Sequence, residues 1–488
     1  MNIMNWRALA KLIGFFSCIV AFLIGISALI SVFYGEKEAL WLAASALIPL
    51  LGGLTLMQFS WNADSDNLSH REATLLIALS WVTAIVWGAF PYLLSKSFGD
   101  YTPLAFLNSL FEATAGFTAT AASVLEPGTA LERLPHGLLF WRALSQWLGG
   151  LGIILMALLY LPFIRSGGME LFQTSSIVRE RIRTKVGEVS KTVLFIYLSL
   201  TALAVFALTV AGMPIFDSLC HGFSTISSGG FSTHTQNVAA YDSRWIEIIL
   251  VFFMILGTTN FALHFSFLKK DWGAYWNSSE LRLYVSVLCV ASLLIWWNLH
   301  TNNQEADFFS VIFNTVSIGS TTGFWNTDTS LWPPFAKAVL LLLMFIGGTV
   351  GSSSGAIKCF RMALLFKYSY REVFRIVHPA GFTPVKLEGR VIDREILEGV
   401  TAFFFIYIFI FTAGSLILQS LGYDITVAVS GVAATLGGVG PGFGELGPAG
   451  GYMHVPVIGK ITLMFCMLLG RVEIFPILVV LSREFWRK

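Results

Sequence analysis

Four short stretches of this 488-residue chain carry the same kind of turn: Ala115-Gly116-Phe117, Gly229-Gly230-Phe231, Thr322-Gly323-Phe324 and Val439-Gly440-Pro441. In each, a short apolar segment runs into a glycine that stands next to Phe or Pro. The marked glycines follow one another at intervals of roughly a hundred residues, as expected for internal repeats. Repeats of similar size with the same turn favour a structure in which four units share one axis.

The composition of the chain is that of a membrane protein. It is 55% hydrophobic and 12% charged, whereas charged residues make up about a quarter of a soluble domain. The sequence therefore predicts an all-α polytopic membrane protein with an uncleaved first helix. Apolar runs of about 20 residues, the length that crosses a bilayer, begin near Leu12, Leu40, Leu75, Leu138, Thr192, Ile246, Leu281, Ala336, Leu397 and Val457, which makes ten expected membrane helices.

Basic residues mark the inner side of the membrane. They crowd the connections at 165–191 and 358–394 and recur at the end of the chain, so the positive-inside rule makes these segments and both termini cytoplasmic. We expect the protein in a bacterial cytoplasmic membrane. Nucleic-acid binding is disfavoured, because the basic loops are short and interleaved with acids and the net charge is only +2.

Each predicted repeat holds one segment too short to span the bilayer. These segments are 103–113, 214–225, 307–317 and 424–434, and apolar segments of this length beside membrane helices are commonly re-entrant. Each opens with Pro or Asp, which suits a helix start. The expected units are an extra helix pair with its cytoplasmic link at 1–73, followed by units at 74–185, 186–275, 276–390 and 391–488.

A helix that enters the membrane and stops halfway points its C-terminal carbonyls inward, and that end carries about half a negative charge. Four such ends on one axis would stabilise a cation, and backbone oxygens of the following stretch would replace its water shell, as in a potassium filter. The alternative is that these glycines only let helices pack closely. Their recurrence in four matching places favours a pore.

Several longer motifs together resemble one family. They are Phe111 to Gly116, Trp147 to Gly152, Ile226 to His234, Thr321 to Phe324, Gly347 to Lys358, Gly440 to Gly442, and Gly470-Arg471. Over almost its whole length the chain resembles the bacterial Trk/Ktr/HKT superfamily of potassium transporters. The TrkH/TrkG branch of that superfamily has an additional N-terminal helix pair, as this chain does.

The resemblance implies potassium uptake through a selectivity filter, with potassium as the substrate and no bound cofactor. It also implies a homodimer in the lipid bilayer and a cytosolic, nucleotide-binding regulatory subunit of TrkA type on the basic inner loops. The implied filter residues are Thr114, Ala115, Gly116, Ser228, Gly229, Gly230, Thr321, Thr322, Gly323, Gly438, Val439 and Gly440.

A run of small residues predicts a break in the segment from Phe335 to Phe366. The nine residues 347–355 are all small except Val350, which makes a poor helix interior. The run resembles the family's intramembrane gating loop, although a simple kink remains an alternative. The expected gating residues are Gly347, Gly348, Gly351, Ser352, Ser353, Ser354, Gly355, Lys358 and Arg471.

Arg471 lies inside the last apolar segment, where insertion of an arginine costs about 2.5–3.5 kcal/mol. The resemblance implies that it faces the pore beneath the filter. A structural ion pair with Glu473 or Glu112 is the alternative. We expect Glu112 itself to be hydrogen-bonded behind the filter.

Two other functions remain to be weighed. A proton- or sodium-coupled potassium symporter would also use broken helices, but the repeats here run parallel and few acids lie within the spans. An enzyme is disfavoured: Gly442-x-Gly444-x-x-Gly447 resembles a dinucleotide-binding motif, yet no strand precedes it.

Overall fold

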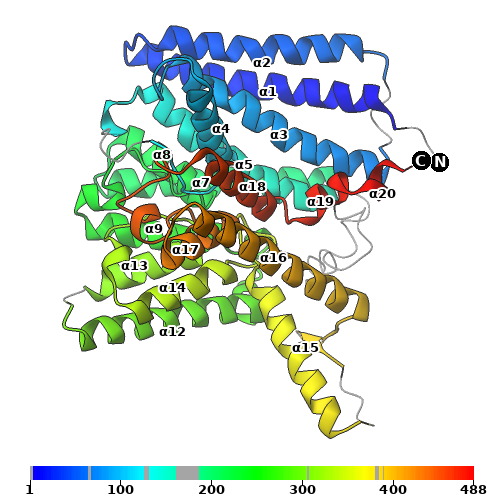
Figure 1. Cartoon of the computed structure of the whole chain (residues 1–488), viewed down its shortest axis with the longest axis vertical. Helices are drawn as coiled ribbons and strands as arrows, with labels where there is room; N and C mark the ends of the chain where they lie inside the picture. The colour runs from blue at the N-terminus through cyan, green and yellow to red at the C-terminus, as the bar shows by residue number, and fades with distance from the viewer. Residues whose placement is uncertain are drawn as a thin grey trace.

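The computed structural model describes residues 4–63, 68–125, 131–160, 186–304, 307–379, 384–387 and 390–487. Within these ranges nearly all of the regular secondary structure is helical. The strands found there, β1 (Lys386–Leu387) and β2 (Arg390–Val391), form a small antiparallel pair in which Lys386 lies opposite Val391. Figure 1 shows α1 and α2 side by side along one edge of the molecule and α12 at the opposite edge. The all-α polytopic fold predicted from the sequence is confirmed.

Among the described residues, seven helices are long and apolar enough to cross a membrane. Two further pairs are each sharply bent at a short break, so the total rises to nine if each pair is one span. The long helices are α1 (Trp6–Phe33), α2 (Ala39–Phe59), α3 (His70–Leu94), α5 (His136–Tyr160), α7 (Val186–Val210), α12 (Ser279–Thr301) and α16 (Arg394–Ser420). The bent pairs are α9 (Arg244–Gly257) with α10 (Phe261–Leu268), at 97°, and α18 (Val457–Arg471) with α19 (Phe475–Leu481), at 117°.

The tenth expected span is not a complete one. The apolar run near Ala336 forms α14 (Pro334–Ile346), whose 13 residues are too few to cross the bilayer. The helix ends because Gly347 has a φ of 66° and leaves the helical conformation. Much of the predicted basic loop at 165–191 lies outside the described residues.

The four short apolar segments are helices, as predicted. They are α4 (Pro103–Phe117), α8 (Ile215–Ile226), α13 (Phe308–Gly319) and α17 (Ile425–Gly437). Side-chain oxygens of Thr102, Asp307 and Asp424 accept hydrogen bonds from the first-turn amides of α4, α13 and α17, and Pro214 precedes α8. The Pro and Asp residues that marked these starts in the sequence therefore lie where the helices begin.

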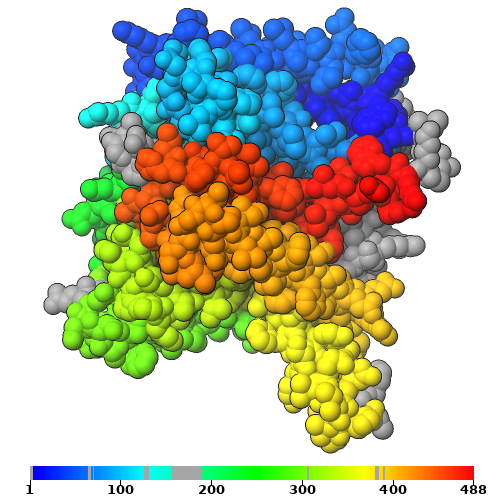
Figure 2. All heavy atoms as spheres, in the orientation of Figure 1, coloured from blue at the N-terminus to red at the C-terminus, as the bar shows by residue number. Residues whose placement is uncertain are grey.

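One arm stands away from the body. It consists of α15 (Cys359–Val377) and the β1–β2 pair, and Figures 1 and 2 show it projecting from the helices around it. The remaining elements are short: η1 (Leu131–Arg133), η3 (Asn237–Tyr241), α11 (Ala274–Asn277), η4 (Thr329–Leu331), η5 (Gly444–Leu446) and α20 (Arg483–Trp486).

The two ends of the described chain meet. The ring of Trp6 stacks on that of Trp486, with centroids 6.3 Å apart, and the side chain of Arg71 at the start of α3 donates to the carbonyl of Phe485. The start of α1 and the last helix, α20, therefore lie on the same side of the molecule. The largest buried apolar cluster joins residues of α1, α3, α4, α5, α16, α17 and α18.

Glycines bring α1 and α2 into backbone contact. A methyl group added to Gly14 would lie 2.7 Å from the carbonyl oxygen of Gly53, and one added to Gly53 would lie 2.6 Å from that of Gly14. Lipid and leucine side chains are equally apolar, so membrane helices associate through such close packing. This contact fixes the distance between the first two helices.

We expect Gly14→Ile to push α1 and α2 apart and lower stability by at least about 1–3 kcal/mol, the usual cost of overpacking. The measurement is the thermal midpoint of the detergent-solubilised protein. Gly25→Ile is the matched control, because it lies on the same helix and a methyl there meets nothing within 4 Å. Equal midpoints for the two variants would contradict the packing argument.

Candidate functional site

The chain leaves each of the four short helices through the same hydrogen-bonded turn. In every case an amide donates to the carbonyl five positions earlier: Thr120 to Ala115 (2.8 Å), Gly229 to Ser224 (2.7 Å), Thr322 to Ser317 (2.9 Å) and Val439 to Ala434 (2.8 Å). The residue before each donor has a positive φ: Ala119 (49°), Ser228 (57°), Thr321 (59°) and Gly438 (74°). These shared features align four loops residue by residue: loop 1 (119–121), loop 2 (228–230), loop 3 (321–323) and loop 4 (438–440).

The alignment corrects one expectation from the sequence. Thr114, Ala115 and Gly116 were predicted to follow the first short helix, but they lie inside the last turns of α4, which ends at Phe117. Gly116 is fully buried there, and a methyl on it would meet Ser145 Oγ at 2.3 Å. The Gly116-Phe117 pair therefore lies in a helix, where Gly116 allows α4 to pack closely against Ser145 of α5. The residues of the first repeat that align with loops 2, 3 and 4 are Ala119, Thr120 and Ala121.

The last positions of the loops lie against one another. A methyl group on Gly230 would lie 2.0 Å from the carbonyl oxygen of Thr322, and one on Gly323 would lie 2.0 Å from that of Val439. One on Gly440 would lie 2.4 Å from the carbonyl carbon of Ala121. Loop 2 therefore adjoins loop 3, loop 3 adjoins loop 4, and loop 4 adjoins loop 1. The methyl group on Gly230 would also lie 2.9 Å from Ala121 Cβ, so loops 1 and 2 adjoin as well and the four loops meet as a ring.

Side chains behind the ring hold it in shape. Gln146 of α5 donates from Nε2 to the carbonyl of Gly229 at 2.7 Å and accepts from the amide of Phe231 at 3.0 Å. Tyr452 donates from its hydroxyl to the carbonyl of Gly440 at 2.6 Å. Part of the backbone around the loops is thus fixed by neighbouring elements.

A buried ion pair supports loop 1. Glu112 accepts from Arg142 Nε at 2.9 Å, from Ser123 Oγ and from the amide of Val124, and the side chains of Glu112 and Arg142 are 0% and 3% exposed. Arg142 also donates to the carbonyl of Ser232 beyond loop 2, at 3.1 Å. The pair therefore connects the segments that follow loops 1 and 2, and Glu112 is hydrogen-bonded as expected. Arg142 was not singled out in the sequence, although a lone arginine in an apolar run is a signal of the same kind as Arg471.

A cavity of about 250 Å³ lies over one end of the ring. His234 lines it and lies between two acids, with Nε2 3.1 Å from Asp217 and Nδ1 3.2 Å from Glu132. The hydrogen bond to Asp217 raises the pKa of His234 above its ordinary value. The cavity is lined by Ala121, Ser123, Leu125, Leu131, Arg142, Gly230, Phe231, Ser232, His234, Thr235, Gln236, Asn237, Gly323, Trp325, Pro441, Gly447, Pro448, Ala449, Gly450, Gly451 and Tyr452.

The segment 347–358 lies at the other end of the ring. Ser353 Oγ is 2.8 Å from Ser228 Oγ of loop 2, and the amide of Gly355 donates to Thr321 Oγ1 of loop 3 at 3.0 Å. A methyl on Gly355 would lie 2.3 Å from the carbonyl oxygen of Gly437, next to loop 4. The segment is irregular backbone that joins α14 to α15 and touches three sides of the ring.

The break between α9 and α10 holds this segment in place. The amide of Thr349 donates to the carbonyl of Thr258, and the amide of Ser353 donates to that of Gly257. In return, the amide of Phe261 donates to the carbonyl of Gly351 at 3.1 Å. Groups freed by the broken helix thus find partners in the segment.

Arg471 approaches the ring from α18. Its Nη1 donates to the carbonyl of Ser353 at 2.6 Å, and its Nε and Nη2 are buried with no hydrogen-bond partner among the described residues. Neither expected alternative partner is used, because Glu112 pairs with Arg142, and Glu473 pairs with Lys358 (2.8 Å) and Arg361 (2.7 Å). Lys358 is therefore part of an ion-pair cluster at the start of α15.

The TrkH family, described as cation transport protein, matches residues 46–488 of this sequence, and that range contains the four loops, the segment 347–358 and Arg471. The chain belongs to the TrkH family. The prediction that it is no enzyme is thereby confirmed, as is the predicted resemblance.

Relatives of the TrkH family match the chain from end to end. The Trk system potassium uptake protein TrkH of Salmonella typhimurium is 33% identical, and that of Escherichia coli K12 is 32% identical; each alignment covers 99% of this chain and 100% of the relative. The crystal structure of the potassium transporter TrkH from Vibrio parahaemolyticus superposes with a TM-score of 0.89 at 32% identity, covering 99% of this chain and 100% of that one. This TrkH-family chain is thus a multi-pass membrane protein with the full length of its relatives.

We expect Arg142→Met to be strongly destabilising, because it leaves the Glu112 carboxylate buried without its cation, at a cost of about 3–5 kcal/mol. The measurement is the thermal midpoint and the yield of monodisperse protein on size exclusion. Arg244→Met is the control, since its side chain is 48% exposed and such surface pairs contribute about 0–1 kcal/mol. A midpoint for Arg142→Met equal to that of the control would show that the buried pair does not support the fold.

Proposed function

We propose that this protein takes up potassium across the bacterial cytoplasmic membrane through a selectivity filter formed by loops 1 to 4. The observation that carries the proposal is that four short helices end in the same hydrogen-bonded turn and that the loops after them lie against one another. Helix C-termini favour a cation there, and backbone oxygens can replace its hydration shell. The names of the relatives, which are potassium uptake proteins, support potassium as the ion.

The filter residues in this proposal are those of loops 2, 3 and 4 as the sequence indicated, together with Ala119, Thr120 and Ala121 of loop 1. The repeats would then be four pore units at 74–185, 186–275, 276–390 and 391–488 around one pore, with 1–73 as an extra helix pair. Both termini would be cytoplasmic. The meeting of α1 and α20 through Trp6 and Trp486 supports placing the two ends on one side.

The same proposal makes 347–358 the gate. The segment and Arg471 lie at the end of the ring opposite the cavity, so they would obstruct the cytoplasmic exit of the pore. Among the described residues, no carboxylate lies within hydrogen-bond range of the Arg471 guanidinium, so no acid there neutralises its positive charge. A fixed positive charge in a low-dielectric passage repels a potassium ion.

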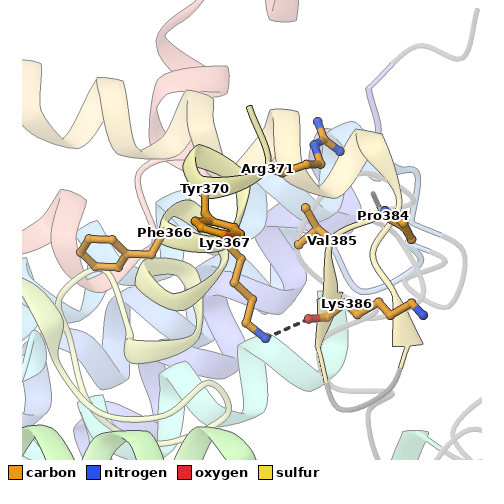
Figure 3. Close-up of a pocket in the computed structure, with 7 residues that line it drawn as sticks. All are labelled: Phe366, Lys367, Tyr370, Arg371, Pro384, Val385 and Lys386. Atoms are coloured by element: carbon orange, nitrogen blue, oxygen red, sulfur yellow. Dashed lines mark hydrogen bonds between the residues drawn. The ribbon is translucent and has the colours of Figure 1, made fainter. Parts of the chain in front are cut away.

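Regulation would come from a partner on the inner surface. We propose a homodimer that binds a cytosolic, nucleotide-binding Trk subunit, and the projecting arm is the described surface best placed for it. Figure 3 shows the residues that line a pocket between α15 and the β1–β2 pair. The pocket has a volume of about 310 Å³, and beside it Lys367 Nζ donates to the carbonyl of Lys386 at 2.9 Å. Tyr370 and Arg371 also line this pocket, so the surface is basic and partly aromatic.

The filter is tested by reversal potentials of liposome-reconstituted protein under opposed potassium and sodium gradients. We expect a potential near that of potassium. Gly323→Ala should abolish the current, since its methyl would lie 2.0 Å from the carbonyl oxygen of Val439 at a φ of 85°. Gly25→Ala is the control, because a methyl there meets open space. Potassium flux that requires an imposed proton or sodium gradient would replace this function with coupled symport.

The gate is tested by Arg471→Gln, which removes the charge and keeps a polar side chain near Ser353. We expect a higher basal rubidium flux into liposomes in the absence of any partner. Arg394→Gln is the control, because its side chain is 87% exposed and pairs only with Glu398 among the described residues. Basal flux equal to that of the parent protein would remove Arg471 from the gate.

A further inference from the structure

A carboxylate from the turn between α1 and α2 binds the start of α5. Glu36 accepts from the backbone amide of His136, from His136 Nδ1 at 2.8 Å and from the amide of Gly137 at 3.4 Å, and it also accepts from Ser31 Oγ. The helix follows Pro135, which has no side-chain oxygen to accept from its first amides. Glu36 therefore caps a helix that begins 100 residues further along the chain.

The cap is charged. The side chain of Glu36 is only 14% exposed. Burial favours its neutral form, but the hydrogen bonds from Ser31 and His136 lower the pKa of Glu36 below its ordinary value. The carboxylate also faces the positive end of the α5 dipole, where a negative charge is stabilising. The turn between α1 and α2 is thus bound to α5 by charge as well as by hydrogen bonds.

Aromatic rings extend this contact to α8. The ring of Tyr34 stacks on that of His136, with centroids 3.9 Å apart and an angle of 2° between the planes. Both rings meet Phe216 in the first turn of α8 edge to face, at 5.7 Å and 4.8 Å. A methyl group on Gly137 would lie 2.5 Å from the carbonyl oxygen of Ser27 on α1. The first helix pair therefore packs closely against the starts of both α5 and α8.

Loop 2 depends on these same two helices. The chain passes from α8 directly into the loop, and Arg142 and Gln146 of α5 form three hydrogen bonds with the backbone at 229–232. A methyl group on Gly150 would lie 2.6 Å from Ser227 Cβ, so α5 also touches the end of α8. Arg142 and Gln146 lie about 9 and 15 Å along α5 from its start. A displacement of that start is carried to them by the helix.

We propose that Glu36 is a positioning residue for the ion filter, through which the first helix pair fixes the outer end of the helix that holds loop 2. Without this cap, α5 shifts or tilts against loop 2 as one body. Such a shift changes the distances from the ion to the backbone oxygens on one side of the ring, and discrimination between potassium and sodium depends on the arrangement of those oxygens. The inference rests on the proposed potassium filter and gives it a support from outside the four repeats.

The test compares the parent protein with Glu36→Gln in liposomes under opposed potassium and sodium gradients. We expect the potassium-to-sodium permeability ratio to fall several-fold, because the amide removes the charge and turns an N–H group toward donors that need an acceptor. Glu38→Gln is the matched control. It removes the same charge from the same turn, and Glu38 makes no hydrogen bond to the start of α2, so its ratio should equal that of the parent protein.

A second readout needs no open gate. Binding of potassium to the folded state raises the thermal midpoint once its concentration exceeds the dissociation constant. Glu36→Gln should need more potassium than the parent protein for the same rise. A general loss of stability lowers the midpoint at every potassium concentration alike, so it does not produce this change.

A milder variant serves if Glu36→Gln does not fold. Tyr34→Leu keeps the carboxylate and removes the ring contacts with His136 and Phe216, and Tyr34 is 44% exposed. We expect it to shift the permeability ratio and the potassium dependence in the same direction as Glu36→Gln, by a smaller factor.

The outcomes separate this inference from the proposed function. It is overturned if the variants at Glu36 and Tyr34 keep the permeability ratio and potassium dependence of the parent protein, even where their midpoints fall. An equal change in Glu38→Gln overturns it as well, since the effect then comes from surface charge. A parent protein that shows neither potassium-selective current nor potassium-dependent stabilisation overturns the proposed function, and this inference with it.

Discussion

The structure depends on how four helix ends can stop inside a bilayer. The last carbonyls of α4, α8, α13 and α17 have no following helical turn whose amides could donate to them. The hydrocarbon of a bilayer offers no water in their place. All four helices end in the same turn, in which a backbone amide donates a hydrogen bond to the carbonyl five positions earlier. Side chains of neighbouring helices hold the loops from behind, and the segment 347–358 contacts them at one end of the ring.

The side chains that support loop 1 form an ion pair, whereas those that hydrogen-bond to loops 2 and 4 are uncharged. Arg142 and Glu112 form a buried pair, whereas Gln146 and Tyr452 use uncharged groups. A charge near a cation pathway changes the potential along it, so a pair with no net charge can stiffen the scaffold with little effect on the ion. Arg471 is different, because it forms no ion pair within the described part of the chain and donates to the carbonyl of Ser353 instead.

The sequence predicted the helical class, the short helices and three of the four loops, because apolar length, helix starts and glycine turns are local signals. It misplaced loop 1, since Gly116-Phe117 looks like the other turns while Thr120-Ala121 carries no glycine. Only the hydrogen bonds reveal that register. The partners of Arg471, Arg142 and Lys358 were also out of reach, because they lie 118, 30 and 115 residues away along the chain. Among the described residues up to nine spans are found against ten expected, because the helix that begins at Pro334 breaks at Gly347.

The segment 347–358 is held by main-chain groups: the carbonyls of Gly257 and Thr258 accept from it, and that of Gly351 accepts from Phe261. The carbonyls of Gly257 and Thr258 and the amide of Phe261 belong to the break between α9 and α10, and these residues are buried. If the segment withdraws, each is left without a partner, at a cost of about 1–3 kcal/mol per group unless water reaches it. In the proposed gating, withdrawal of the segment would therefore be coupled to hydration of the inner passage, because water would have to replace the lost hydrogen-bond partners.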